Sequence, residues 1–151
     1  MLNNDYRDIL RILLKNEARF LIVGAYAMSA YGYSRATGDV DIWVEATKEN
    51  SIQVYTSLKE FGAPLSQIDT HTFATKGIVF QIGVAPCRID IITYIDGVEF
   101  QEAFDSKKII EIDDLAIPFL SKENLIKNKS STHRKKDQLD VEYLLNGENM
   151  C

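Results

Sequence analysis

The chain has 151 residues and a formal net charge of −5, with 46% hydrophobic and 26% charged residues. These totals are typical of one globular domain, and the negative charge argues against a protein that coats nucleic acid over its whole surface. No run approaches the roughly 20 apolar residues that a membrane span needs, and two cysteines are too few for a disulfide framework. We therefore expect a single domain over residues 1–151, in a reducing, cytoplasmic compartment and without a membrane partner.

The first third of the chain predicts a helix, a buried strand and a second helix. Apolar residues recur at helical spacing over residues 4–16, where Asn3 or Asn4 is available as the N-terminal cap. Residues 20–23 form a short apolar run that ends at Gly24, and residues 25–33 resume a helical pattern rich in alanine.

The middle of the chain alternates strands with short helices. Thr47 and Gly62 are suited to begin and end a helix between them. The Asp96-Gly97 pair indicates a turn. The expected strands are 39–44, 78–82, 89–93 and, as edge strands, 108–112 and 116–120, and a further short helix is expected at 100–104.

The last thirty residues predict two helices. Ser121 would cap a helix that ends near Lys129, residues 134–145 would form the final helix, and the polar segment 128–132 would join them. The fold class is thus α/β, with a small mixed sheet flanked by helices over residues 1–120 and a helical C-terminal tail over residues 121–151.

Three aspartates are the candidate metal ligands. Residues two apart in a strand share a face, so Asp39 and Asp41 point the same way while Val40, Ile42 and Val44 face the core. Asp90 repeats this arrangement in a later strand, between two inward isoleucines. If the two strands are neighbours, the three carboxylates converge, and a pair of Mg²⁺ ions is the usual partner of such a cluster. An Asp-X-Asp pair alone is also common at strand edges without a metal.

A glycine turn and a polar loop lie next to these acids in the sequence. Gly24 separates a strand from a helix, where backbone N–H groups suit a phosphate, although such a glycine is more often only a tight turn. Arg35 and Thr37 precede the carboxylates and are able to donate to phosphate oxygens. The alternative interpretation is that Arg35 and Thr37 lie in a solvated loop and bind no phosphate.

Taken in order, these features resemble the polymerase-beta-like nucleotidyltransferase superfamily. There, a glycine motif that opens a helix precedes an Asp-X-Asp or Asp-X-Glu strand, and a third carboxylate follows later. The C-terminal part is similar to the bacterial minimal and abortive-infection-toxin branches, which carry Leu-X-X-X-Lys and Arg-X-Lys-Asp-X-X-Asp motifs. The matching runs are VGA (23–25), GYSRATGDVDI (32–42), CRIDII (87–92), LIKNK (125–129) and RKKDQLD (134–140).

This resemblance implies a role for each candidate residue. Asp39 and Asp41 would hold the metal ions that bridge a nucleoside triphosphate such as ATP, and Asp90 would complete the metal site and help activate an acceptor hydroxyl. Lys129 would contact phosphate or acceptor. The nucleotide-binding set would be Gly24, Ala25, Arg35, Thr37 and Arg134, and Asp137 and Asp140 would position Lys129 or Arg134.

The implied activity is transfer of a nucleoside monophosphate to a hydroxyl of RNA, such as tRNA, or of a partner protein, with a possible role in a toxin–antitoxin pair. A local excess of cations favours RNA; these cations are Lys122, Lys127, Lys129, Arg134, Lys135 and Lys136. No pattern in the sequence predicts an oligomeric state.

The glycine motif of this chain departs from that of the superfamily, which leaves a second interpretation of the function open. The chain has Gly24-Ala25 where the superfamily usually has Gly-Gly or Gly-Ser, and alanine offers no hydroxyl to a phosphate. The alternative is a non-catalytic binding module, either an antitoxin or a nucleotide-binding regulator. Trp43 would share a face with the carboxylates and is available to stack on a base, although a core position is the more common role of such a residue.

Overall fold

The structure is a computed structural model that describes residues 2–32, 39–84, 87–132 and 134–146. Six strands form one mixed sheet in the order β3-β4-β2-β1-β6-β5. The strands are β1 (Phe20–Val23), β2 (Asp39–Val44), β3 (Val79–Ile82), β4 (Arg88–Ile92), β5 (Lys108–Ile112) and β6 (Leu115–Phe119).

The sheet is mixed because its central strands pair in both directions. β2 lies antiparallel to β1 and parallel to β4, whereas β1 lies parallel to β6. The outer strands β3 and β5 each pair antiparallel with their inner neighbour. β2 and β4 are therefore interior strands, and their shared register fixes which side chains meet across them.

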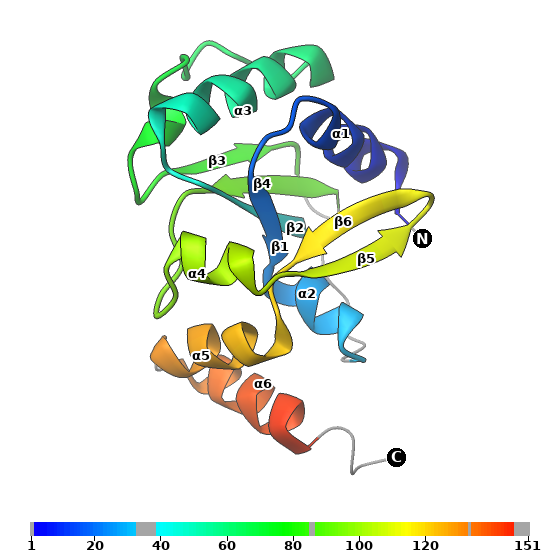
Figure 1. Cartoon of the computed structure of the whole chain (residues 1–151), viewed down its shortest axis with the longest axis vertical. Coiled ribbons are helices and arrows are strands. Elements are labelled where there is room, and N and C mark those ends of the chain that lie inside the picture. The colour runs from blue at the N-terminus through cyan, green and yellow to red at the C-terminus, as the bar shows by residue number, and fades with distance from the viewer. Residues whose placement is uncertain (1, 33–38, 85–86, 133, 147–151) are drawn as a thin grey trace.

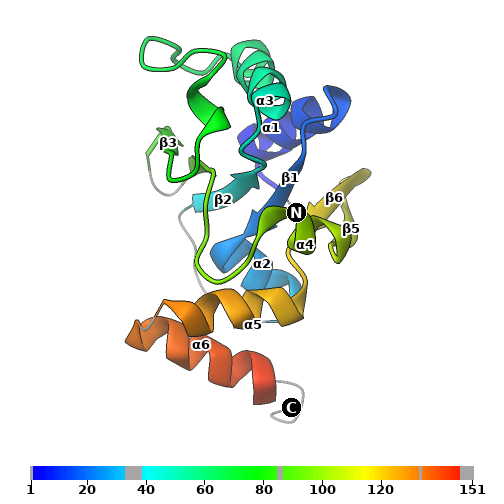
Figure 2. The same cartoon turned by 60° about the vertical axis from the view of Figure 1, so that its left-hand side comes forward.

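Helices lie at both ends of the view in Figures 1 and 2, with the sheet between them. At one end, α1 packs against α3, and at the other α5 and α6 form an antiparallel pair next to α2. The helices are α1 (Asn4–Lys15), α2 (Gly24–Ala30), α3 (Lys48–Phe61), α4 (Phe100–Asp105), α5 (Lys122–Ser131) and α6 (Lys135–Asn146), with a 3₁₀ turn η1 at Thr72–Ala74.

Capping residues explain why three of these helices begin where they do. Asn3, Thr47 and Ser121 each accept a hydrogen bond from a backbone N–H in the first turn of α1, α3 and α5. Gly62 ends α3 in the left-handed conformation, with φ of 94°. These caps are among those that the sequence predicts.

Apolar residues alternate with polar ones along β2, and this alternation separates the core from the site. Val40, Ile42 and Val44 are fully buried, whereas Asp39 and Asp41 are partly exposed on the opposite face. The predicted inward and outward faces of this strand are confirmed.

Three element predictions are wrong in detail. The second helix begins at Gly24 and ends at Ala30, because Tyr31 leaves the helical path as the C-cap. β6 is not an edge strand, since it pairs with both β1 and β5. Residues 128–131 are not a joint but the last turn of α5.

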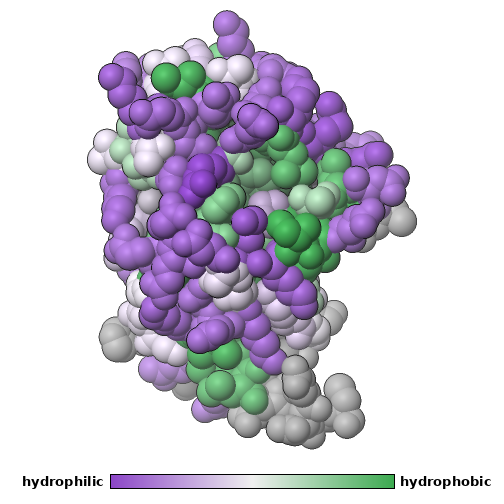
Figure 3. Space-filling model, in the orientation of Figure 1, coloured by the Kyte–Doolittle hydropathy of each residue, from purple (hydrophilic) through white to green (hydrophobic). Residues whose placement is uncertain are grey.

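The surface in the orientation of Figure 1 is mostly hydrophilic, with apolar areas where β5 and β6 lie and where α5 and α6 lie (Figure 3). The large apolar residues exposed on these elements are Ile109, Leu139 and Leu145. Within the described ranges, no helix combines the length and the apolar character that crossing a bilayer would require.

Candidate functional site

The three predicted carboxylates converge at the start of β2 and β4. The parallel register places Asp41 opposite Asp90 and Asp39 opposite Arg88. One oxygen from each of Asp39, Asp41 and Asp90 lies within 4.8 Å of the others. Asp90 is buried, with 5% of its surface exposed, so it lies beneath the cluster rather than facing solvent as a simple strand alternation implies. Three hard oxygen donors at this spacing suit a divalent cation.

Arg88 binds two of the three acids. Its Nε lies 2.9 Å from Asp90 Oδ1, and its Nη2 lies 3.0 Å from Asp90 Oδ2 and 3.1 Å from Asp39 Oδ2. The contact with Asp90 is therefore bidentate, which is the geometry that a planar guanidinium favours. The guanidinium of Arg88 therefore balances part of the negative charge of the cluster.

Burial and neighbouring charges make the Asp41 carboxyl hard to ionise. Burial and the negative charges of Asp39 and Asp90 raise the pKa of Asp41 to about 7, and the nearby charge of Arg88 offsets this only in part. A carboxyl that is hard to ionise beside two others gains a partner when a further cation enters. The cluster is therefore electrostatically prepared for a metal ion.

Gly24 lies directly against Asp41 at the start of α2. Its φ is +69°, and a Cβ built on it would lie 2.3 Å from Asp41 Oδ2. Only glycine combines that backbone conformation with the space that the carboxylate occupies. The predicted glycine turn and the predicted carboxylates are thus parts of one structure, with Val23 paired opposite Asp41 across β1 and β2.

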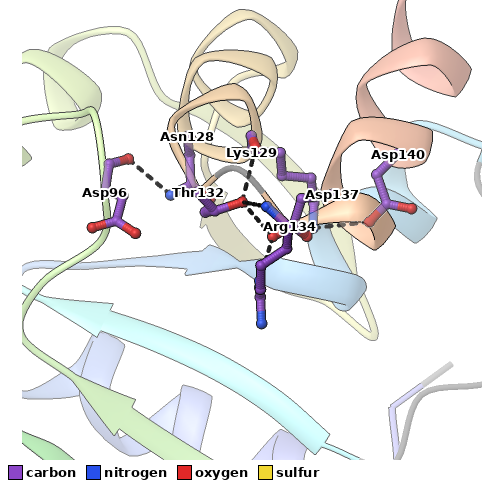
Figure 4. A network of polar contacts seen from close by, with 7 residues as sticks. All are labelled: Asp96, Asn128, Lys129, Thr132, Arg134, Asp137 and Asp140. Atoms are coloured by element: carbon purple, nitrogen blue, oxygen red, sulfur yellow. Dashed lines mark hydrogen bonds and ion pairs between the residues drawn. The ribbon is translucent and has the colours of Figure 1, made fainter.

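Lys129 lies in a second polar cluster, between α5 and α6 (Figure 4). Only 7% of Lys129 is exposed, and its Nζ lies 3.2 Å from Asp137 Oδ1 and 3.0 Å from Asp140 Oδ2. Thr132 and Arg134 donate to the other oxygen of Asp137 at 2.6 and 2.7 Å. The two aspartates therefore hold the lysine in place between the helices.

Hydrogen bonding determines the charge state of Asp137. Burial alone would raise the pKa of Asp137, but hydrogen bonds from Thr132 and Arg134 and the charge of Lys129 outweigh burial and lower it. The carboxylate form of Asp137 is thus part of the folded structure. Lys129 is also an ion-pair partner of Asp140.

Arg35 and Thr37 lie outside the described residues. Ala25 is in the first turn of α2, directly after Gly24. Trp43 follows Asp41 on the same strand face but is only 2% exposed, and its ring packs edge-to-face on Phe100 at 5.1 Å, so the expected core position holds.

Arg88 is the residue at this site that the sequence prediction missed. Its signal was present in the sequence, since Arg88 and Asp90 are two apart in a strand and so share a face. The contact with Asp39 required the register between β2 and β4, which the sequence does not state.

Comparisons with known proteins agree with this geometry. Residues 2–146 match a sequence family described as "Nucleotidyl transferase of unknown function (DUF2204)". A search of curated proteins found no match.

Two solved structures share the fold at low sequence identity. One is TM1012 from Thermotoga maritima, provisionally described as a nucleotidyltransferase, with a TM-score of 0.61, 14% identity and coverage of 97% of this chain and 96% of that one. The other is the lincosamide antibiotic adenylyltransferase LnuA with lincomycin bound, with a TM-score of 0.58, 15% identity and coverage of 96% and 97%.

Proposed function

This chain belongs to that nucleotidyl transferase family, and from this premise we propose that it transfers a nucleoside monophosphate from a Mg²⁺-bound nucleoside triphosphate to a hydroxyl group. The observation that carries the proposal is the convergence of Asp39, Asp41 and Asp90 beside Gly24. We propose that one domain, residues 1–151, carries this activity, and that its residues 121–151 supply Lys129 and Arg134.

The donor set fits a divalent cation. Its three oxygens lie close together, and the cluster already binds the positive charge of Arg88. Asp39, Asp41 and Asp90 would hold Mg²⁺, which neutralises phosphate charge and orients the reacting groups when bound. Two such ions would suit three carboxylates and a triphosphate.

The protein's own residues would then position the substrates. The acceptor hydroxyl loses its proton, which would pass to a carboxylate of the cluster and then to water, and its oxygen forms a bond to the α-phosphorus. The bond between the α-phosphorus and the bridging oxygen breaks, and pyrophosphate leaves with that electron pair. Asp90 would help to activate the acceptor hydroxyl, and Gly24 leaves space for Asp41 at the start of α2. Lys129 and Arg134 would contact phosphate or acceptor. Most of the rate enhancement would come from positioning and charge neutralisation.

The acceptor proposed from the sequence is an RNA such as tRNA, or a protein side chain, in a cytoplasmic toxin-type role. The structure weakens the electrostatic support for RNA. Lys127 pairs with Glu102, Lys129 pairs with Asp137 and Asp140, and Arg134 pairs with Asp137. Three cations of the basic segment are therefore already neutralised within the protein. LnuA, which has the same fold, is described as acting on a small-molecule antibiotic.

Radiolabelled nucleotides test the proposal directly. The purified protein is incubated with Mg²⁺ and each α-labelled triphosphate, together with tRNA, a cell extract or a fraction of small metabolites. We expect label transfer that requires Mg²⁺ and is lost by at least 100-fold in Asp41→Ala, since that carboxylate is central to the cluster. The proposal is wrong if no fraction is labelled, or if Asp41→Ala labels as well as wild type.

A second candidate function is a non-catalytic binding module, either an antitoxin or a nucleotide-binding regulator. Two observations favour it: Ala25 lacks a hydroxyl, and Arg88 occupies two of the three acids. Calorimetry with a non-hydrolysable triphosphate separates the two functions when combined with the labelling assay. Binding without turnover supports a regulator, and rescue from a co-encoded toxin supports an antitoxin.

A further inference from the structure

We propose that a cavity at the end of β2 and β4 binds a neutral, ring-shaped group of a small hydroxylated acceptor molecule. The proposal rests on the transferase function above and names its acceptor class. The cavity has a volume of about 140 Å³ and is lined by residues that include Trp43, Tyr94 and Phe100. It is separate from both polar clusters, since none of Asp39, Asp41, Asp90 or Lys129 lines it.

The volume matches one six-membered ring. A cavity of about 150 Å³ holds a benzene molecule, and the same space would hold only about five waters. Trp43 and Phe100 meet edge-to-face at 5.1 Å and give the cavity a rigid aromatic wall. Tyr94, which also lines the cavity, is 48% exposed. A ring with apolar faces and polar edges would therefore fit.

The charged residues of the lining are already paired. Glu45 binds Arg19 at 3.0 Å, and Glu99 binds Lys76 at 3.0 Å. A charged ligand group would have to compete with these ion pairs, whereas a neutral one would not. The cavity therefore favours an uncharged ring over a phosphate, a carboxylate or an ammonium group.

The position of the cavity assigns it to the acceptor rather than to the nucleotide. Trp43 is two residues beyond Asp41 on the same strand face, which is roughly 7 Å along β2. Gly24 and its helix approach Asp41 from the β1 side, whereas Tyr94 and Thr93 extend the cavity beyond β4, which carries Asp90. With phosphates on the Gly24 side, the cavity lies on the side of the acid that would activate the acceptor.

Trp43 is the only tryptophan in the chain and lines this cavity, so its fluorescence is a probe of an occupant. The intact protein is titrated with methyl α-D-glucopyranoside, myo-inositol and adenosine, each with and without Mg²⁺ and a non-hydrolysable triphosphate. We expect a saturable change in Trp43 emission with at least one of the two neutral, non-nucleoside rings.

Two variants locate the binding, with calorimetry as the readout. Ala46→Phe places a ring in the cavity that Ala46 lines and should weaken binding at least 10-fold. Ile52→Phe, at an exposed position on α3, is the matched control and should bind as wild type. Thermal melts confirm that each variant is folded.

The outcomes separate this inference from the proposed function. Binding of a neutral ring that survives in Asp41→Asn supports the cavity even if label transfer fails. A change in Trp43 emission with adenosine or the triphosphate alone, and not with the neutral rings, would contradict the inference. The cavity would then bind a nucleoside, either that of the triphosphate or the terminal one of an RNA. The absence of any response also overturns the inference.

Discussion

At the residue scale, one contact in the candidate site joins a glycine to an acid. Gly24 adopts φ of +69°, and the space where its Cβ would lie is taken by the Asp41 carboxylate. The positive φ and the space taken by Asp41 each disfavour a side chain at position 24, and glycine satisfies both conditions. A substitution at Gly24 therefore disturbs the backbone and the carboxylate cluster together.

Gly24→Ala should destabilise the protein by about 2–4 kcal/mol, because left-handed backbone strain and overpacking against Asp41 add. The Asp41 carboxylate must also move, so label transfer should fall by at least 10-fold. Urea denaturation and the labelling assay measure the two effects.

Gly62→Ala is the matched control for this prediction. Gly62 has φ of +94°, but nothing lies within 4 Å of its would-be Cβ. Its alanine variant should lose only about 1–2 kcal/mol of stability and keep wild-type transfer. Equal activity in the two variants would contradict the role given to the Gly24–Asp41 contact.

At the scale of elements, α5 and α6 are held together by charges as well as by apolar packing. Lys129 on α5 is buried against Asp137 and Asp140 on α6, and the apolar residues Leu125 and Leu144 are buried on the same two helices. Breaking one member of a buried ion-pair network typically costs 3–5 kcal/mol, because the remaining charges lose their partner.

The pairing of Asp137 predicts acid sensitivity of this helix pair. The folded-state pKa of Asp137 is lowered, so its contribution to stability is present above the ordinary carboxyl pKa of 3.8 and is lost as the pH falls through the lower folded value. We expect the free energy of unfolding to fall as the pH drops from 5 to about 2. In Asp137→Asn the protein should be less stable at pH 7, and the remaining fall with acid should be smaller.

Asp8→Asn serves as the comparison, since Asp8 is an exposed carboxylate on α1. It should keep the wild-type dependence on pH in urea denaturation. An unchanged acid response in Asp137→Asn would show that this carboxylate is not stabilised by folding.

Much of the arrangement of elements was predictable from local signals. The alternation in β2 and the caps at Asn3, Thr47 and Ser121 are short-range patterns, and the structure confirms them. The end of α5 was not predictable in this way. Asn128 and its neighbours favour a loop by propensity, but Asn128 donates to the Asp96 carbonyl from within the helix. A tertiary contact therefore outweighs a weak local preference.

The candidate site was predictable only where spacing within one strand decides it. Asp39 and Asp41 share a face by alternation, whereas the approach of Asp90 and Arg88 depends on the pairing of β2 with β4. Residues 45–87 of the chain separate those strands, and no local sequence pattern determines their register. The direct contact of Gly24 with Asp41 likewise depends on the pairing of β1 with β2.

At the scale of the whole molecule, the C-terminal helices are fastened to the rest of the chain at a turn. Gly97 lies so close to α5 that a Cβ there would come within 2.1 Å of Ser131 Oγ. The same turn receives the hydrogen bond from Asn128 to Asp96. Residues 121–146 are thus tied to the loop that follows β4, which supports the proposal of one domain rather than two.

We expect the whole chain to unfold in one transition because of these contacts. Trp43 fluorescence reports on the sheet, and far-UV circular dichroism reports chiefly on the helices. The two urea curves should coincide within error. A helical transition that comes before the loss of Trp43 signal would show that α5 and α6 form an independent unit.

The pairing of β2 with β4 also determines when during folding the cation cluster can exist. Asp41 and Asp90 meet only after the chain between them, with α3 and β3, has folded back. Such long-range pairing closes late in folding. A nascent chain shorter than about 90 residues has only two of the three acids, Asp39 and Asp41. If the cluster binds a metal ion as proposed, metal affinity would therefore appear only when β2 pairs with β4.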